Sequence, residues 1–295
     1  MSKKLMFVMI CHNDIGHIKR SIETVIRSIV GKYEDKVGIL FVDDCSDDGS
    51  FEFATTLLDG VGSAVRTPEN MNVGGARNFG IDHLNSLPQD LRPEYIWFHD
   101  SDDYISDDGL ERVMNTLERN PGVDILTIPI ATLKYGALHE LELYQSAVSQ
   151  TCLENAANSP VGAWSKVFKL SKWVPNAPYQ MCEHVAWHYE LFDQMDSWAK
   201  VEGETPCYVW DRTNDKAISE TVDFCNANSN TIEGLAFSDI LVHRGLKDKW
   251  VSDNLRNIAN MYDVRHRIKK HWVRECWAIR FRNECASMMS GHHVH

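Results

Sequence analysis

The stretch that decides the fold is Val37-Gly38-Ile39-Leu40-Phe41-Val42-Asp43-Asp44-Cys45-Ser46-Asp47-Asp48-Gly49-Ser50. In it, a continuous apolar run is followed at once by acidic residues, a glycine and a serine. A short apolar run of this kind predicts a buried β-strand over Val37–Val42, and the polar residues after it predict a turn. Ser50 then suits the start of a helix that continues to about Leu58.

The same order of apolar run, turn and helical pattern repeats on both sides of this stretch. We expect strands at Leu5–Ile10, Val61–Arg66 and Tyr95–Phe98, and helices from about Ile15 to Ile29 and from near Val73–Ala76. This alternation through residues 5–125 predicts an α/β fold with a Rossmann-like, mostly parallel sheet flanked by helices. Ligands of such sheets bind outside the carboxyl ends of the strands, so the residues that follow each strand are candidates for function.

Polar residues follow three of the expected strands. They are Cys11-His12-Asn13-Asp14, Asp43-Asp44 and Asp100-Ser101-Asp102-Asp103. The last segment places three carboxylates within four residues, where their repulsion is costly unless a cation lies among them. Carboxylate oxygens suit Mg²⁺ or Mn²⁺, and these ions often keep positions for substrate phosphates. The alternative is a solvated acidic loop at the start of a helix.

Two segments suit the parts of a nucleotide. One carboxylate of Asp43-Asp44 could accept hydrogen bonds from a nucleobase and from ribose hydroxyls, whereas Asp47, Asp48 and Ser50 suit a turn and a helix cap. Farther along, Asn72-Val73-Gly74-Gly75-Ala76-Arg77-Asn78 combines glycines, the N-terminus of a helix and a cation. Together these features suit a diphosphate.

These segments, in this order, resemble the motifs of the family 2 glycosyltransferases of the GT-A fold. The VDDxSxDxS-like, NxGxxxARNxGI-like and DxDD motifs of that family correspond here to residues 42–50, 72–81 and 100–103. The resemblance covers about residues 5–220, because Trp164-Ser165-Lys166 resembles the family's W-x-K segment and residues 208–219 resemble the end of its core.

The resemblance implies that the donor is a nucleotide-diphosphate sugar, by default a UDP-sugar, and that its sugar passes to a hydroxyl acceptor with inversion. It also implies that Asp102, assisted by Asp100, binds Mn²⁺ or Mg²⁺, and that Asp44 holds the nucleoside together with the turn after the first strand. The residues that we expect to contact the donor are Cys11, His12, Asn13, Asp44, Asn72, Arg77, Asp100, Ser101 and Trp187.

The general base is the point at which this sequence departs from the family. The family usually supplies it from a Glu-Asp pair at the start of a helix, but this chain has Glu183-His184. Either Glu183 takes the role, or His184 does, because an unperturbed histidine with a pKa of about 6.5 is a competent base near neutrality. Trp187 lies three residues beyond this pair and could stack on a sugar ring.

Length and composition place the chain among ordinary globular proteins. Its 295 residues, of which 43% are hydrophobic and 24% charged, can form one large domain or a domain with an appendage. The pattern becomes mixed after residue 125 and turns helical and basic beyond about residue 230. We therefore expect a glycosyltransferase domain over residues 1–225, with a nucleotide-sugar half (1–125) and an acceptor half (126–225), and a helical appendage over residues 226–295.

The sequence also favours a location in the cytoplasm. The apolar run near the N-terminus is too short for the core of a signal peptide, and no stretch approaches the roughly 20 apolar residues that a membrane span requires. Eight cysteines are scattered without a CxxC pair, which favours reduced thiols. The enzyme could also contact the inner face of the membrane peripherally, or act in the cytoplasm of a phage-infected host.

The acceptor is the least determined feature. A net charge of −12 argues against a protein coated for nucleic acid, but residues 242–282 hold eleven Lys or Arg against four Asp or Glu. The first alternative is a cell-surface glycan or its precursor, with the basic segment at the membrane. The second is a phage-type transfer to hydroxymethylated bases of DNA, with this segment along the phosphates. A third alternative concerns the activity itself: the chain could be a non-catalytic relative that only binds nucleotide sugars.

Overall fold

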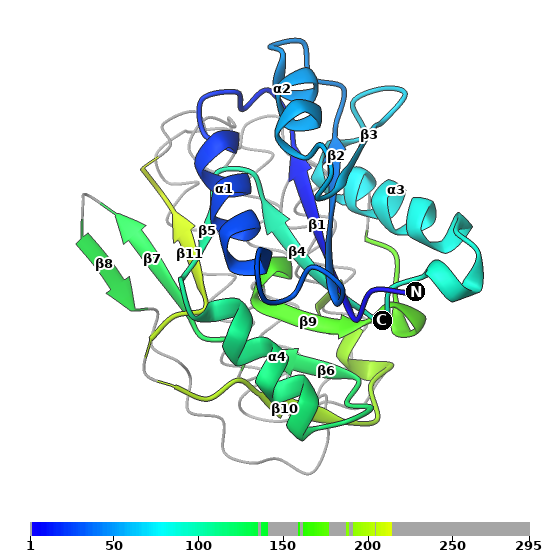
Figure 1. The fold of residues 1–295 in the computed structure, drawn as a ribbon, viewed down its shortest axis with the longest axis vertical. Helices are drawn as coiled ribbons and strands as arrows, with labels where there is room; N and C mark the ends of the chain where they lie inside the picture. Colours follow the sequence, from blue (N-terminus) through cyan, green and yellow to red (C-terminus); the bar gives the residue numbers. More distant parts are fainter. Residues whose placement is uncertain are drawn as a thin grey trace, which may run out of the picture.

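The computed structural model describes residues 2–134, 137–140, 159, 162–176, 187–188, 191–203 and 205–213, which form two β-sheets with helices packed on the larger one (Figure 1). The larger sheet has seven strands in the order β10 (Trp198–Lys200), β6 (Ile125–Thr127), β9 (Lys166–Lys169), β4 (Tyr95–Asp100), β1 (Leu5–Cys11), β2 (Val37–Asp43) and β3 (Ser63–Arg66). The smaller sheet has the order β5 (Tyr104–Ile105), β11 (Tyr208–Asp211), β7 (Ile130–Lys134) and β8 (Ala137–Glu140).

Four α-helices have their bounds within these residues. They are α1 (Ile18–Ile29), α2 (Ser50–Leu57), α3 (Asn72–Ser86) and α4 (Gly109–Arg119), with short 3₁₀ turns at η1 (Gln89–Leu91), η2 (Ala163–Ser165) and η3 (Leu170–Lys172). Residues 187–188 and 191–193 are also helical. The expected elements of residues 5–86 are therefore present, with ends that move by up to three residues.

The central strands are parallel, as the βα alternation predicts. β1 pairs in parallel with β2 on one side and with β4 on the other, and β2 pairs in parallel with β3. All seven residues of β2 are buried, because this strand lies inside the sheet with side chains packed on both faces. A continuous apolar run is the expected sequence for such a strand, and this is why the local signal was sufficient.

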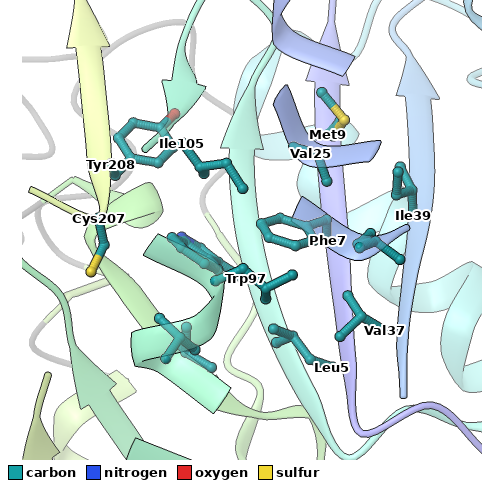
Figure 2. Packing of buried hydrophobic residues seen from close by; sticks show 14 of the residues in the cluster. Leu5, Phe7, Met9, Val25, Val37, Ile39, Trp97, Ile105, Cys207 and Tyr208 are labelled. Carbon is teal, nitrogen blue, oxygen red and sulfur yellow. The ribbon is translucent and has the colours of Figure 1, made fainter. Parts of the chain in front are cut away.

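Each face of the larger sheet has its own apolar core. On one face, α1 contributes Ile18, Ile22, Val25 and Ile29, whose spacing by three or four residues places them on one side of the helix. Figure 2 shows part of this core on the face of β1, β2 and β4, and Trp97 of β4 stacks there on Phe7 at 4.8 Å. The opposite face is covered by α3, so the sheet is buried on both sides.

Gly80 allows α3 to lie close to the sheet. A Cβ atom at this position would lie 2.9 Å from a methyl group of Val42 on β2 and 3.0 Å from one of Val8 on β1. Both distances are shorter than ordinary van der Waals contact, so a larger side chain would push the helix away. The glycine near the end of the NxGxxxARNxGI-like segment thus serves helix-sheet packing.

Beyond β4 the chain departs from the simple alternation. The apolar run Ile125–Ile130 divides into two strands in different sheets, since β6 ends at Thr127 and β7 begins at Ile130. β9 lies between β4 and β6 and is antiparallel to both. Its pairing joins segments about 40 to 70 residues apart, and so no short window of the sequence could indicate it.

Several sequence-based predictions lie outside the described residues. They include the domain boundary at residue 225, the helical appendage over residues 226–295 and its basic segment 242–282. These stay predictions. Among the helices that the structure describes, none has the length and apolar character needed to cross a membrane.

Candidate active site

The candidate site lies at the carboxyl edge of the three central strands. The register pairs Cys11 with Asp43 and Ile10 with Asp100, so that β1, β2 and β4 end beside one another. The segments that follow these strands therefore meet at one edge, as their positions in the sequence predict. We call Asp100–Asp103 the acid loop.

The turns after β1 and β2 are joined by hydrogen bonds. The Asn13 N–H donates to Ser46 Oγ at 2.9 Å, the Asp47 N–H donates to Asn13 Oδ1 at 2.9 Å, and the Ile15 N–H donates to Asp48 Oδ2 at 2.9 Å. Asn13 has a φ of 51°, a conformation that asparagine tolerates better than most residues. Asp48 thus serves the turns through its carboxylate, as expected, and Asp47 through its backbone N–H.

Cys11 belongs to the core and not to the exposed part of the site. Its side chain is buried, and burial raises the pKa of its thiol to about 12. Its carbonyl oxygen accepts a hydrogen bond from the Asp44 N–H at 2.7 Å. The expected donor contact of Cys11 therefore does not fit this position, whereas His12 and Asn13 in the same turn are exposed.

His12 links the turn after β1 to the segment before α3. Its Nδ1 lies 2.7 Å from the carbonyl oxygen of Asp44, and its Nε2 lies 3.1 Å from the side-chain amide nitrogen of Asn70. These two contacts hold the ring in one orientation beside Asp44.

Asp43 and Asp44 are both buried but have different partners. Asp43 Oδ2 accepts hydrogen bonds from Arg66 Nε at 2.8 Å and from the Ser46 N–H at 3.0 Å. Asp44 Oδ1 accepts from Thr67 Oγ1 at 3.0 Å and from the Met71 N–H at 2.8 Å, and burial raises its pKa. Asp43 therefore fastens β2 to β3, whereas Asp44 faces the start of α3.

Arg77 is not exposed at the N-terminus of α3, where it was expected to meet a diphosphate. Its side chain is only 3% exposed, its Nη2 donates to Asp100 Oδ1 at 3.1 Å, and its guanidinium lies 5.6 Å from the centre of the Phe98 ring. Arg77 is thus placed to hold the Asp100 carboxylate. Asn72 is the partly exposed first residue of α3, and its N–H donates to Asn70 Oδ1 at 3.0 Å.

The three carboxylates of the acid loop differ in exposure. Asp100, with a 28% exposed side chain, and Asp102 are partly exposed, whereas Asp103 is fully buried. Ser101 between them is buried, and its hydroxyl donates to Asp14 Oδ2 at 2.9 Å. Burial and then the negative charges of Asp102 and Asp100 raise the pKa of Asp103 well above its usual range.

The family of the chain follows from its comparison with known proteins. The model of glycosyl transferase family 2 matches residues 6–158, more than half of the chain, and spans residues 11–14, Asp43-Asp44, the start of α3 and the acid loop. The chain belongs to glycosyl transferase family 2. This membership confirms the family that the three motifs indicated.

Two curated family relatives align over shorter stretches. An uncharacterized glycosyltransferase of Haemophilus influenzae is 31% identical over 98 residues, which are 32% of this chain and 36% of that protein. The minor teichoic acid biosynthesis protein GgaA of Bacillus subtilis is 25% identical over 121 residues, 40% of this chain and 26% of that protein. The chain thus aligns with only about a third of the first relative and a quarter of the second.

A solved structure resembles the fold. The crystal structure of S. aureus TarS 1-349 in complex with UDP-GlcNAc superposes with a TM-score of 0.64 at 14% identity, and the match covers 99% of this chain and 93% of that one. This likeness confirms the expected GT-A type of fold. Family and relatives together support a glycosyltransferase enzyme.

The acid loop offers some, but not all, of the ligands that a divalent cation needs. Asp100 and Asp102 offer hard carboxylate oxygens at the sheet edge, and one or two carboxylates with substrate phosphates are a common ligand set for Mg²⁺. No group of three metal-binding side chains occurs among the described residues, so this part of the chain supplies no complete cage. Repulsion within the loop is also relieved by Arg77, and Asp103 has hydrogen-bond partners of its own.

The position of Trp187 has a clear outcome, whereas the general base stays a prediction. Trp187 is 1% exposed, packs among Phe98, Phe168 and Trp173, and donates from Nε1 to the carbonyl oxygen of Val174 at 2.8 Å. A ring with so little exposed surface cannot stack on a sugar, so that prediction is not supported. The base candidates Glu183 and His184 lie outside the described residues.

Sequence reasoning missed the residues that hold the acid loop from outside. They are Arg20, Tyr208 and Asp211, each of which contacts Asp102 or Asp103, while Asp14, which accepts from Ser101, was noted only as part of the turn after the first strand. Only a weak signal was available. Tyr208 and Asp211 were noted as part of the resemblance to the end of the family's core, but no pattern in the chain pairs them with residues about 100 positions earlier.

Proposed function

We propose that the chain is an inverting glycosyltransferase that takes a sugar from a nucleotide-diphosphate donor, by default a UDP-sugar, and transfers it to a hydroxyl of a cell-surface glycan or its precursor. The observation that carries the proposal is the convergence of Asp44, Asp100 and Asp102 at one edge of the sheet. Membership in glycosyl transferase family 2 gives this convergence its interpretation.

In this proposal the edge divides into a nucleoside part and a diphosphate part. Asp44 and the oriented ring of His12 bind the nucleoside, with Asn13 and Asn72 at the border of the same region. Asp100 and Asp102 lie toward the diphosphate, and Ser101 fixes the loop between them through Asp14. Arg77 orients the Asp100 carboxylate through an ion pair.

A divalent cation, Mn²⁺ or Mg²⁺, is part of the proposal. When bound by Asp102 and Asp100, it would supply Lewis-acid stabilisation of the charge that develops on the departing nucleotide diphosphate. The chain's own contribution is to hold these two carboxylates at the sheet edge while their neighbour Asp103 stays buried.

Deprotonation of the acceptor hydroxyl is assigned to Glu183 or His184, and both assignments stay open. Whichever residue is the base, its substitution should leave the affinity for the donor unchanged and lower the turnover rate. Glu183→Gln and His184→Ala, measured side by side for donor affinity and for turnover, identify the base as the residue with the larger loss of kcat. A loss of donor affinity in both variants would contradict this assignment.

A glycan acceptor is favoured by what is known of the relatives. GgaA is named for minor teichoic acid biosynthesis, and TarS was solved with UDP-GlcNAc. We therefore place the acceptor among cell-wall or other surface polymers rather than among nucleic acids, and we place the reaction in the cytoplasm. Residues 1–125 and 126–225 would serve as the donor and acceptor halves.

The donor can be identified with a thermal-shift panel. The purified chain is mixed with MnCl₂ and a UDP-, GDP-, CDP- or dTDP-sugar, and the melting temperature is recorded with and without each sugar nucleotide. A ligand that binds only the folded state adds about 2.7 kcal/mol to the free energy of unfolding at a hundredfold excess over its Kd. The melting temperature rises as a result. We expect one nucleotide to give the largest shift and EDTA to abolish it.

The transfer reaction is tested with the selected donor. Release of the free nucleotide is measured with and without polymer acceptors such as teichoic acid, and the anomeric configuration of the product is read by NMR. Acceptor-stimulated release with an inverted product supports the proposal. Binding of the donor without any release of nucleotide would favour the non-catalytic alternative, and the absence of binding to all four nucleotides would remove the proposed function.

A further inference from the structure

We infer that Asp103 and Tyr208 form a latch that positions the acid loop, so that the second sheet sets the geometry of the donor site. Asp103 is then a positioning residue, although it belongs to the same acidic run as the two residues assigned to the cation. The inference rests on the proposed function for its catalytic meaning, but the latch can be tested without it.

Asp103 has its hydrogen-bond partners on β11 of the smaller sheet. Its Oδ2 accepts from the hydroxyl of Tyr208 at 2.6 Å, and its Oδ1 accepts from the Asp211 N–H at 2.8 Å. The side chain is fully buried, so both oxygens are engaged within the protein. A short hydrogen bond to a buried carboxylate is among the stronger contacts in proteins.

Tyr208 connects this carboxylate to the end of β4. Its hydroxyl donates to Asp103 and at the same time accepts from the Asp100 N–H at 3.1 Å. One oxygen atom on β11 therefore fixes both ends of the acid loop. Asp102 lies between these two fixed points, so its position depends on them.

The ring of Tyr208 is itself held firmly. It stacks on Trp164 with 5.1 Å between ring centres and 1° between planes, and Trp164 accepts a hydrogen bond at its carbonyl oxygen from Trp97 Nε1 at 2.9 Å. Figure 2 shows Tyr208 in the buried core with Trp97 and Ile105. Because the ring is fixed by packing, the hydroxyl has a defined position.

Arg20 of α1 contacts both the acid loop and β11. Its Nη2 donates to the carbonyl oxygen of Asp102 at 3.1 Å and forms an ion pair with the carboxylate of Asp211. The guanidinium also lies 4.8 Å from the centre of the Tyr104 ring. The acid loop is therefore tied to a helix and to a strand that both lie far from it in the sequence.

The test compares Tyr208→Phe with Tyr95→Phe. Tyr208→Phe removes the hydroxyl that bridges the loop and keeps the ring that stacks on Trp164. Tyr95→Phe is the control, because it removes an equally buried hydroxyl, which donates to the Val123 carbonyl oxygen at 2.7 Å. Tyr95 begins strand β4, and Asp100 of the acid loop ends it, so the control lies away from the loop. Tyr208→Phe should lose more stability in chemical denaturation than Tyr95→Phe, since it removes two hydrogen bonds, to Asp103 and from the Asp100 N–H, and Tyr95→Phe removes one.

Hydrogen exchange measures the latch directly. The Asp100 and Asp211 amides should exchange at least about tenfold faster in Tyr208→Phe than in the wild type, at equal distance from the melting temperature, because local opening becomes easier. In Tyr95→Phe these amides should keep their wild-type rates. Unchanged exchange at Asp100 in Tyr208→Phe would overturn the latch.

Titration of Mn²⁺ measures its functional consequence. With the nucleotide sugar that the wild type binds best, the Mn²⁺ concentration for half-maximal binding should rise about tenfold in Tyr208→Phe and stay unchanged in Tyr95→Phe. Equal titrations for the two variants would overturn the positioning role and leave the proposed function standing. A wild type that binds no nucleotide sugar would overturn the proposed function, while the exchange experiment would still decide on the latch.

Asp103→Asn separates shape from charge. Asparagine keeps the size of the side chain and an acceptor for the Asp211 N–H, so it should restore part of the exchange protection that Asp103→Ala loses. A positioning role predicts partial rescue of the Mn²⁺ titration as well. If Asp103→Asn behaves like Asp103→Ala in both measurements, the side chain acts through its charge and the positioning role is wrong.

Discussion

The two acidic segments at the sheet edge look alike in sequence and differ in the folded chain. Asp43-Asp44 and the acid loop Asp100–Asp103 each follow an apolar strand. In each, one carboxylate is used for fastening: Asp43 binds Arg66 of β3, and Asp103 binds Tyr208 of β11. The other carboxylates differ in their surroundings, since Asp44 is buried against the start of α3 while Asp100 and Asp102 are partly exposed.

The comparison teaches that a run of acids at a strand end is not one site. A fastening carboxylate should affect stability more than ligand binding, whereas an exposed carboxylate should do the reverse. Substitutions of single acidic residues test this division.

Asp102→Asn should have the largest effect and should act on activity alone. Loss of a cation ligand removes several kcal/mol of transition-state stabilisation, so kcat/KM should fall at least about 100-fold. The melting temperature should stay close to that of the wild type, because Asp102 is partly exposed. Transfer rates and donor binding are measured over a Mn²⁺ series.

Asp107→Asn is the matched control for this substitution, since Asp107 is an exposed aspartate five residues farther along the chain. It should leave Mn²⁺-dependent binding unchanged. Full metal-dependent activity in Asp102→Asn would show that the cation is bound elsewhere.

Asp43→Ala should act on stability. Asp43 is fully buried and accepts from Arg66 Nε and the Ser46 N–H, so its removal leaves two donors without their partner. The free energy of unfolding should fall by about 2 to 3 kcal/mol, toward the low end for a broken buried pair because Arg66 is partly exposed. Urea denaturation gives this value, and a stability equal to that of the wild type would show that Asp43 fastens nothing.

Asp44→Asn should weaken nucleotide binding moderately. Asparagine can still accept from Thr67 Oγ1 and the Met71 N–H, so the fold should be retained. It replaces one acceptor oxygen by a donor, and the Kd of the nucleotide should rise about tenfold. Calorimetry with UDP, at a fixed Mn²⁺ concentration, measures the change; an unchanged Kd would place the nucleoside away from Asp44.

Glu52→Gln should have the smallest effect. Glu52 is the second acidic partner of Arg66, at 3.4 Å, but its side chain is 66% exposed. Exposed ion pairs contribute little, so the free energy of unfolding should change by less than about 0.5 kcal/mol. Compared with Asp43→Ala in the same denaturation series, this variant shows whether burial or charge decides the contribution of each partner of Arg66.

Much of the fold could be predicted because its signals are local. Buried parallel strands such as β1 and β2 are continuous apolar runs, and the residues of α1 that face the core recur at helical spacing. Parallel pairing places strand ends at one edge, so the meeting of residues 11–14, 43–44 and 100–103 also followed from the sequence. The pairing of β9 between β4 and β6 did not, because it joins distant segments.

The candidate site was predicted in outline but not in its details. Which residues lie at the edge followed from their place after each strand, yet Cys11, Arg77 and Trp187 turned out to be buried. Burial of a single side chain depends on the elements packed around it, and the same residue type can be exposed or enclosed. A tryptophan three residues after a candidate base carries no sign of the Phe98 and Trp173 rings that surround it.

The sequence by itself determined the family, the central parallel sheet and the edge at which acidic residues gather. Only the tertiary structure decided which of those acids are held inside the protein and which remain partly exposed. The physical reason is that a short run of neighbouring residues is enough to determine a strand. The partners of Asp43 and Asp103 instead come from β3 and β11, about 20 and 100 residues away. Their hydrogen bonds exist only once the sheets have assembled.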